Sequence, residues 1–350
     1  MGMTSPSEAA AETADADGFT SLRIKDVVHE TDDAISIIFD VPPQLAEHFS
    51  YRAGQYLALR VEVGGQEYRR CYSMSSSPAK HPDLRVTVKR DRDGVVSNWL
   101  NDNAAPGDRI SVAAPEGRFV RSDNGRELVA FAGGSGITPV FSLIQTELAH
   151  SAGRARLLYA NREVSSVIFR EALDGLADEH ADRFALQHHL DVEQGVVTAE
   201  KIAAFIADTD SDADCFVCGP GPFMDTVERA LLDAGVPAER VHLERFTVAP
   251  VPTASPGAQV TETVTIELDR ETVTVDYRPG HTLLQMARMA GLRAPSSCET
   301  GSCGTCIAQV TEGEARLLNN DALDEDEVAE GLVVTCQAIP TSRTIRFVYE

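Results

Sequence analysis

Hydrophobic and polar positions alternate along the first third of the chain in short stretches that end at turn residues. The alternating segments are residues 21–29, 34–40, 55–63, 67–73, 84–89 and 109–113. A two-residue period is typical of strands with one buried face, and several such strands in close succession predict a small antiparallel β-barrel. A short helix is expected to begin at Asn98.

The pattern changes near Glu127, where apolar strands begin to alternate with amphipathic helices. The expected strands are residues 128–132, 156–160, 184–188, 215–218 and 241–246, and the expected helices are residues 140–149, 167–179, 199–207 and 223–234. This alternation predicts a doubly wound α/β domain with a parallel sheet.

The last quarter of the chain has a third pattern. Residues 248–261 are uncharged and rich in proline and small residues, which predicts a semi-rigid linker. Strands are then expected at residues 263–268 and 272–277, and a helix at residues 281–290. Hairpin, helix, cysteine-bearing loop and final strands follow in the order of a β-grasp ferredoxin, an α+β fold.

Charge and composition exclude several classes of protein. The net charge is −23, so nucleic acid is not an expected partner. The chain starts without the basic and apolar stretches of a signal peptide, and no later segment is apolar enough to cross a membrane. We therefore expect a cytoplasmic protein with reduced thiols. The acidic run at residues 321–330 is either a solvated face or a docking surface for a basic partner.

Four of the seven cysteines have the spacing C-x4-C-x2-C followed by one distant cysteine; they are Cys298, Cys303, Cys306 and Cys336. This is the ligand pattern of a plant-type [2Fe–2S] cluster. Gly301 and Gly304 give the loop the backbone freedom to wrap a cluster. Structural zinc is a weaker alternative, because no histidine or second cysteine pair accompanies Cys336, and a disulfide framework is weaker still.

Two glycine-rich loops follow strands of the expected parallel sheet. In the first, residues 132–139, three glycines let backbone N–H groups approach a pyrophosphate, and Pro139 starts the following helix. The second, residues 218–224, would flank the same crevice at the carboxyl edge of the sheet, where dinucleotides bind. Either loop alone is also compatible with a tight corner, because the full G-x-G-x-x-G is absent.

The barrel half contains two further candidate binding segments. Along the strand ending at Ser73, alternation sends Arg70 and Tyr72 to one side and Cys71 and Ser73 to the other. One side could hold a phosphate and stack on a flat ring, and the other could hydrogen-bond to the ring edge. Residues 94–97 lie before the expected helix and after two cations, an arrangement that also suits a phosphate.

These motifs, in this order, resemble the ferredoxin-NADP reductase superfamily with a C-terminal plant-type ferredoxin domain. Residues 157–162, 166–169 and 242–246 more narrowly resemble the reductase components of 3-ketosteroid 9α-hydroxylases, and phenylacetyl-CoA epoxidase reductases are near relatives. The resemblance implies an NAD(P)H-dependent oxidoreductase. FAD would accept a hydride from NADH, with NADPH left open, and a [2Fe–2S] cluster would pass single electrons to a separate terminal oxygenase.

The sequence patterns divide the chain into domains, and the resemblance implies residue roles. The expected division is a disordered leader at 1–18, an FAD-binding β-barrel at 19–124, an NAD(P)-binding domain at 125–247, a linker at 248–261 and a ferredoxin domain at 262–350. Hydride transfer is assigned to Ser73, Cys218, Glu244 and Phe246. The implied FAD contacts are Arg70, Cys71, Tyr72, Ser73, Val88, Lys89, Arg90, Val95, Val96 and Ser97. The implied nucleotide contacts are Gly133, Gly134, Ser135, Gly136, Thr138, Cys218, Gly219 and Pro220, and Phe246 would cover the flavin until nicotinamide displaces it.

Two pairs of reactive side chains are expected to be structural. Cys215 and Cys218 lie three apart on a strand, so they point to opposite faces and do not form a redox pair. His188 and His189 have no other ligand at metal spacing and are expected at the surface.

Other functions and the choice of nucleotide remain open at this point. A redox-sensing module would need an effector domain, and a flavin enzyme with its own substrate would need a further domain; neither is visible. Arg162 and Arg170 follow the second strand of the nucleotide domain, where a 2′-phosphate would sit, but Glu163 intervenes.

Overall fold

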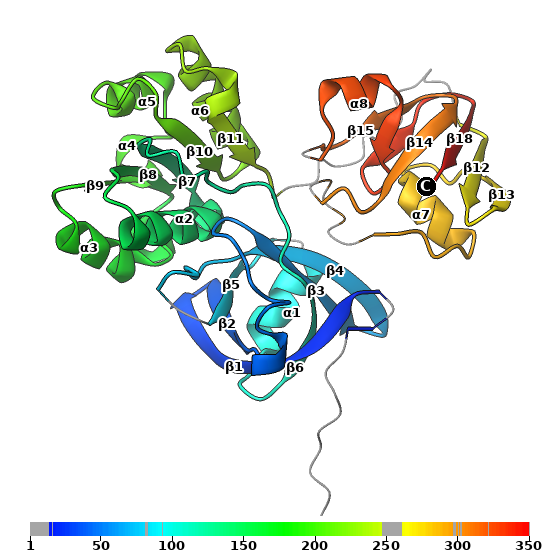
Figure 1. Ribbon diagram of the computed structural model, residues 1–350, viewed down its shortest axis with the longest axis horizontal. Helices are drawn as coiled ribbons and strands as arrows, with labels where there is room; N and C mark the ends of the chain where they lie inside the picture. The colour runs from blue at the N-terminus through cyan, green and yellow to red at the C-terminus, as the bar shows by residue number, and fades with distance from the viewer. Residues whose placement is uncertain are drawn as a thin grey trace, which may run out of the picture.

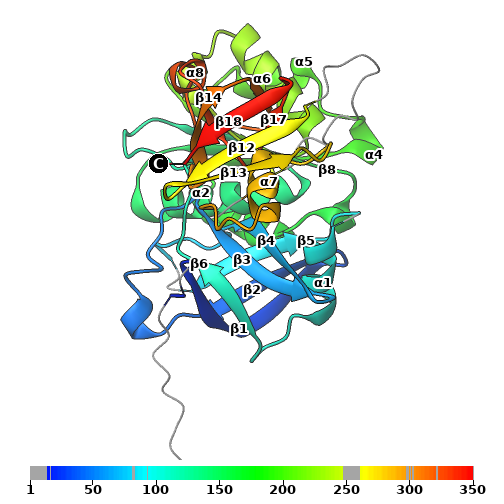
Figure 2. The ribbon, with the colours of Figure 1, turned by 90° about the vertical axis from the view of Figure 1, so that its right-hand side faces the viewer.

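The computed structural model describes residues 14–15, 17–80, 83–92, 94–246, 261–296, 299, 301, 303–320 and 322–349. They form three bodies, which Figure 1 shows as a barrel domain below, an α/β domain at the upper left and a C-terminal domain at the upper right. Seen from the side in Figure 2, the C-terminal domain lies above the barrel and in front of the α/β domain. No helix within the described ranges is long and apolar enough to cross a membrane.

The barrel domain is a curled antiparallel sheet with the strand order β4-β3-β6-β1-β2-β5. Its elements are β1 (Phe19–Thr31), β2 (Ala34–Asp40), β3 (Tyr56–Val63), β4 (Gln66–Ser73), β5 (Leu84–Lys89), α1 (Val95–Asn103) and β6 (Arg109–Ala113). An antiparallel bridge between Met74 and Val86 joins the two outer strands, so the sheet closes on itself. The apolar side chains of alternate strand positions fill its interior, which confirms the expected barrel.

Helix α1 begins three residues before the predicted start at Asn98. Gly94 is its N-cap, and a β-carbon there would lie 2.2 Å from the hydroxyl of Ser97. Val96 and Leu100 are buried against the barrel interior. Burial of these side chains therefore outweighs the low helix propensity of the two valines that open the helix.

The α/β domain is a parallel sheet with the strand order β11-β10-β7-β8-β9, covered on both faces by helices. Its strands are β7 (Leu128–Gly133), β8 (Ala155–Asn161), β9 (Phe184–Leu190), β10 (Asp214–Cys218) and β11 (Val241–Glu244), and its helices are α2 (Ile137–His150), α3 (Arg170–Glu179), α4 (Asp191–Gln194), α5 (Ala199–Ile206) and α6 (Gly221–Asp233). The doubly wound sheet is as predicted. The strand order reverses between β7 and β10, which brings the two glycine-rich loops together at the switch point of the sheet.

Several details of the α/β domain differ from the expectation. Helix α3 begins at Arg170 rather than at 167, because a short 3-10 turn and Phe169, at φ 60°, precede it. The four-residue helix α4 carried no sequence signal. His189 was wrongly expected at the surface: it is 1% exposed, and its Nε2 lies 2.7 Å from the carbonyl oxygen of Gly195.

The C-terminal domain has a five-stranded mixed sheet, order β13-β12-β18-β14-β16, and a two-stranded one, β15-β17. Its elements are β12 (Thr263–Leu268), β13 (Glu271–Asp276), α7 (Leu283–Met289), β14 (Ile307–Glu312), β15 (Ala315–Leu317), α8 (Glu325–Ala329), β16 (Leu332–Val334), β17 (Ala338–Pro340) and β18 (Thr344–Val348). Thr282 caps α7 in a capping box with Gln285. Part of the acidic run forms α8, which Asp324 caps.

The barrel and the α/β domain share one hydrophobic core. Phe119 of the barrel meets Phe216 of β10 edge to face, with ring centroids 5.1 Å apart. Arg121 and Glu147 form an ion pair at 2.8 Å, in which the side chains are 10% and 8% exposed. These two domains therefore form one packed unit.

Candidate functional site

The last residue of β4 meets the last residue of β11. Ser73 is 3% exposed, and its hydroxyl donates a hydrogen bond to Oε2 of Glu244 at 3.0 Å. Glu244 is aligned with Cys218 across the parallel pair of β11 and β10. Three residues that the sequence placed in different segments therefore converge where the barrel touches the carboxyl edge of the parallel sheet.

Successive residues of β4 face opposite sides. Tyr72 packs toward the barrel interior, and Cys71 packs on the other side, with Phe19 and Ala58. Burial raises the pKa of the Tyr72 phenol, so the ring stays neutral. Within the described residues Arg70 forms no ion pair with a carboxylate, and its guanidinium donates to the carbonyl of Arg69 at 2.7 Å. Arg70 therefore offers a positive charge that an anion can use.

Helix α1 presents its N-terminus beside the end of β5. Its N-cap, Gly94, provides no side-chain oxygen, so the first amides of the helix are available to an anion. The two preceding cations are already engaged: Lys89 lies 3.5 Å from Asp33, and Arg90 lies 2.6 Å from Asp102.

The three valines assigned to the flavin differ in exposure. Val88 is fully buried in the barrel and Val96 is 2% exposed, so neither residue presents its side chain at the surface. Val95 is 43% exposed and is the one valine of the three whose side chain reaches the surface. Ser97 is 8% exposed, and its hydroxyl accepts a hydrogen bond from the amide of Asp91.

The two glycine-rich loops pack backbone against backbone. A β-carbon at Gly136 would lie 2.1 Å from the carbonyl oxygen of Cys218, and one at Gly133 would lie 2.8 Å from Pro220. Gly134 is different: its φ is +53°, and no atom would lie within 4 Å of a β-carbon. Gly133 and Gly136 are therefore needed for packing, and Gly134 for its left-handed backbone.

A buried tyrosine supports the first loop, and sequence reasoning missed it. The hydroxyl of Tyr159 donates to the carbonyl of Gly134 at 3.0 Å and accepts from the amide of Ile168 at 3.2 Å. Thr138 also ties the loop, by donating to the carbonyl of Ser135 at 3.1 Å. A tyrosine within an apolar strand predicts only a core position, so the sequence carried no signal for this support.

The other two residues assigned to hydride transfer, Cys218 and Phe246, differ in burial. Cys218 is fully buried, and burial, with a smaller contribution from Glu244, raises the pKa of its thiol well above the ordinary range. It is therefore a neutral thiol at physiological pH. Cys215 lies on the opposite face of the sheet, as expected. Phe246 is 38% exposed and lies two residues beyond the end of β11.

The C-terminal loop brings described cysteines into a setting that suits an iron–sulfur cluster. Cys306 and Cys336 are buried in one apolar cluster, and the amide of Thr305 donates to Sγ of Cys303 at 3.4 Å. Gly301 and Gly304 have φ of +89° and +76°, as a loop that turns amides toward sulfur requires.

The predicted fourth ligand, Cys298, lies outside the described residues. In the part of the chain that the structure covers, cysteines form no disulfide, and no three candidate ligands gather closely enough to hold one metal ion. A [2Fe–2S] cluster divides four thiolates between two irons, so its ligands need not gather around a single ion.

Comparisons with known proteins agree with this geometry. Residues 21–120 match the oxidoreductase FAD-binding domain, residues 131–229 the oxidoreductase NAD-binding domain, and residues 266–341 the 2Fe-2S iron–sulfur cluster binding domain. Over 331 residues the chain is 40% identical to the ferredoxin reductase component of 3-ketosteroid-9-alpha-monooxygenase from Rhodococcus rhodochrous, covering 92% of this chain and 94% of the relative. The chain belongs to this family of ferredoxin reductase components.

More distant matches share the same architecture. The reductase is 33% identical to a component of the 1,2-phenylacetyl-CoA epoxidase from Escherichia coli, covering 93% of this chain and 96% of the relative. Its fold is similar to that of phthalate dioxygenase reductase, with a TM-score of 0.70, 26% identity, and coverage of 96% of this chain and 100% of that one. The predicted superfamily, three-domain fold, FAD and [2Fe–2S] cofactors and role as an electron-transfer oxidoreductase are thereby confirmed.

Proposed function

We propose that this reductase takes electrons from NADH and delivers them to a separate terminal oxygenase that hydroxylates a 3-ketosteroid. The observation that carries the proposal is the 40% identity, across 92% of the chain, to a component of 3-ketosteroid-9-alpha-monooxygenase. Delivery to phenylacetyl-CoA epoxidase is the second candidate, supported by 33% identity over 93% of the chain.

For electron entry, we assign binding to β4 and to the start of α1. When bound, FAD accepts a hydride from nicotinamide, and the cluster carries single electrons. Arg70 and the first amides of α1 hold phosphate oxygens, and the Tyr72 ring offers a flat neutral surface. The Ser73 hydroxyl has one proton to donate, and in this structure its hydrogen bond goes to Glu244. A flavin acceptor would compete with Glu244 for that hydrogen bond, so Glu244 holds the hydroxyl in place until the flavin binds.

The nucleotide loops and Phe246 complete the entry site in this proposal. Gly134, with its positive φ, and the loop tied by Thr138 present backbone amides to the pyrophosphate. The neutral Cys218 thiol lies beneath the crevice without adding charge near the reacting edge. Phe246 covers the flavin while nicotinamide is absent.

We propose NADH as the donor because of Glu163. This residue lies two positions after the end of β8, its side chain is exposed, and it forms a capping box with Ser166 at the next 3-10 turn. A carboxylate at this position accepts hydrogen bonds from ribose hydroxyls and repels a 2′-phosphate.

For electron exit, we propose that Cys298, Cys303, Cys306 and Cys336 hold the cluster. The proposed division is an FAD-binding domain at 19–124, a nucleotide-binding domain at 125–247, a linker at 248–261 and a ferredoxin domain at 262–350. The ferredoxin domain then serves as the outlet toward the oxygenase.

The test is reconstitution with purified oxygenases. The reductase, NADH and the oxygenase component of a 3-ketosteroid 9α-hydroxylase should yield hydroxylated steroid and consume NADH in equal amounts. The oxygenase of phenylacetyl-CoA epoxidase, supplied at the same concentration, should be supported far less well. Higher turnover with the epoxidase would replace the steroid assignment by the second candidate, and NADH oxidation without product from either would reject both.

A further inference from the structure

A charge network connects the barrel domain to the C-terminal domain. Oδ2 of Asp17, just before β1, lies 3.0 Å from Nη2 of Arg69 on β4. Oδ1 of the same carboxylate lies 3.1 Å from Nη2 of Arg293, which follows α7. The same Oδ2 lies 3.6 Å from Nη1 of Arg60 on β3, so one carboxylate joins two arginines of the barrel to one arginine of the C-terminal domain.

Arg69 of the barrel also contacts the C-terminal domain directly, without Asp17 in between. Its Nη1 donates to the carbonyl oxygen of Ser296 at 3.2 Å, and Ser296 lies two residues before the proposed cluster ligand Cys298. The Arg69 side chain is 13% exposed, with its guanidinium 5.1 Å from the centre of the Phe19 ring. Arg69 is thus a fixed donor to the segment that leads into the cluster loop.

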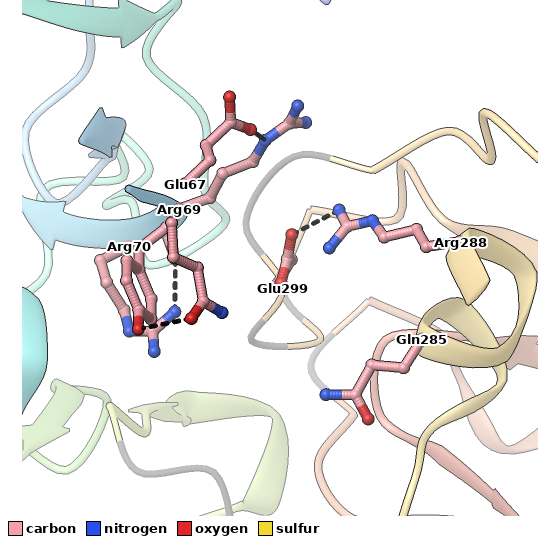
Figure 3. Close-up of a pocket in the computed structure, with 8 residues that line it drawn as sticks. Glu67, Arg69, Arg70, Gln285, Arg288 and Glu299 are labelled. Carbon is pink, nitrogen blue, oxygen red and sulfur yellow. Dashed lines mark hydrogen bonds and ion pairs between the residues drawn. The ribbon is translucent and has the colours of Figure 1, made fainter. Parts of the chain in front are cut away.

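The network lies at the edge of a cavity of about 300 Å³ between the two domains. Figure 3 shows Glu67, Arg69 and Arg70 on the barrel side, and Arg288 paired with Glu299 on the opposite side. Arg288 also donates to the hydroxyl of Ser296 at 2.8 Å. Ser296 is therefore held from both domains, by its carbonyl and by its hydroxyl.

The same strand carries the proposed flavin contacts. Arg69 precedes Arg70 on β4, and residue 72 packs toward the barrel interior, opposite to the side on which Arg69 lies over Phe19. Any displacement of the cluster loop relative to β4 therefore changes the distance between the proposed FAD site and the proposed iron–sulfur cluster. The Asp17 and Arg293 side chains are 36% and 79% exposed, so salt can weaken their attraction.

We propose that Asp17, Arg69 and Arg293 are positioning residues that hold the cluster loop against β4 and so set the rate of electron transfer from FAD to the cluster. The inference rests on the proposed roles of β4 and of the four cysteines. Hydride transfer should not depend on this bridge, because the site at Ser73 and Glu244 is built on the packed unit of the other two domains.

The test uses the full-length holoprotein and the variant Asp17→Asn, which removes the charge with little change in shape. Asp40→Asn is the matched control, because Asp40 forms an exposed ion pair with Arg23 elsewhere on the barrel. Anaerobic mixing with NADH separates flavin reduction from cluster reduction, which is followed by absorbance and by freeze-quench electron paramagnetic resonance. Small-angle X-ray scattering of the oxidised protein measures domain separation independently of activity.

We expect Asp17→Asn to slow cluster reduction by roughly three- to tenfold at low salt, with flavin reduction unchanged. At low salt, the radius of gyration of Asp17→Asn should exceed that of the unaltered protein. At high salt, the unaltered protein should reach the same larger value. Arg293→Gln should slow cluster reduction to the same extent. The double variant of Asp17 and Arg293 should slow it no more than either single variant, because both substitutions break the same bridge. Cluster reduction and scattering equal to those of Asp40→Asn would overturn the inference. Failure of NADH to reduce the unaltered protein would instead reject the proposed function.

Discussion

Replacing Ser73 by alanine tests the assignment of the hydride-transfer site. The hydroxyl is 3% exposed and donates to Glu244 at 3.0 Å, so its loss removes one hydrogen bond to a charged acceptor. Such bonds stabilise a fold by about 1.5–3 kcal/mol. A donor aimed at developing charge contributes about 2–4 kcal/mol to a transition state. At about 1.36 kcal/mol per factor of ten, flavin reduction should slow by roughly 30- to 1,000-fold.

The assay is anaerobic stopped-flow reduction with NADH, followed by flavin absorbance, with the FAD content of each preparation measured after denaturation. Ser75→Ala is a matched control, because Ser75 is fully buried and its hydroxyl lies 2.7 Å from that of Thr87 inside the barrel. The control should lose stability without a comparable loss of rate. If Ser73→Ala retains FAD and is reduced at the unaltered rate, Ser73 has no part in hydride transfer.

Glu244→Gln separates orientation from charge at the same site. The amide oxygen of glutamine can still accept the Ser73 hydrogen bond, but the negative charge is lost. If Glu244 only orients Ser73, this variant should keep most of the rate. A loss as large as that of Ser73→Ala would show that the carboxylate charge itself acts on hydride transfer.

The other predictions concern the domain division, the cluster, the nucleotide loops and the buried thiols. Residues 19–247 made alone should hold FAD and reduce ferricyanide with NADH but not cytochrome c; loss of flavin would contradict the proposed domain division. Cys303→Ser should lose the cluster, measured by iron content and electron paramagnetic resonance, while NADH still reduces the flavin; normal oxygenase turnover would show that electrons leave by another route. Gly136→Ala places a β-carbon 2.1 Å from the Cys218 carbonyl and should raise KM for NADH at least severalfold, with an unchanged KM as the contrary result. Burial raises the pKa of Cys215 to about 12 and that of Cys218 well above its ordinary range, so at pH 8 both thiols stay protonated and should resist iodoacetamide until the protein unfolds; rapid alkylation, located by mass spectrometry, would contradict this.

The strands were predictable because their signal is local. Alternation at residues 34–40 and 84–89 reproduces β2 and β5 residue for residue. Helix starts were less predictable, because α1 depends on burial of Val96 against strands distant in sequence. His189 shows the same limitation, since its hydrogen-bond partner, the carbonyl of Gly195, lies in a loop that follows its strand.

The site was predictable as separate pieces but not as an assembly. Ser73 and Glu244 were both chosen from sequence, yet the bond between them joins residues 171 positions apart. The glycines at 133 and 136 were attributed to pyrophosphate approach, and the structure adds a packing reason that needs the neighbouring strand. Asp17 was included in the predicted leader, and only the folded arrangement shows it between Arg69 and Arg293.

The barrel meets its two neighbours through different chemistry, and this difference fits the two kinds of electron transfer. Toward the α/β domain, apolar rings and the buried Arg121–Glu147 pair give contacts that salt screens weakly. Hydride transfer needs reacting atoms held within about 3–3.5 Å, so a rigid interface suits it. Toward the ferredoxin domain, Asp17 and Arg293 form a contact that salt can loosen. In the proposed path, a cluster that receives electrons at β4 and gives them to another protein benefits from such a contact, because firm docking speeds loading while release exposes the cluster loop. Oxygenase turnover should therefore pass through a maximum as ionic strength rises, whereas flavin reduction by NADH should change little over the same range.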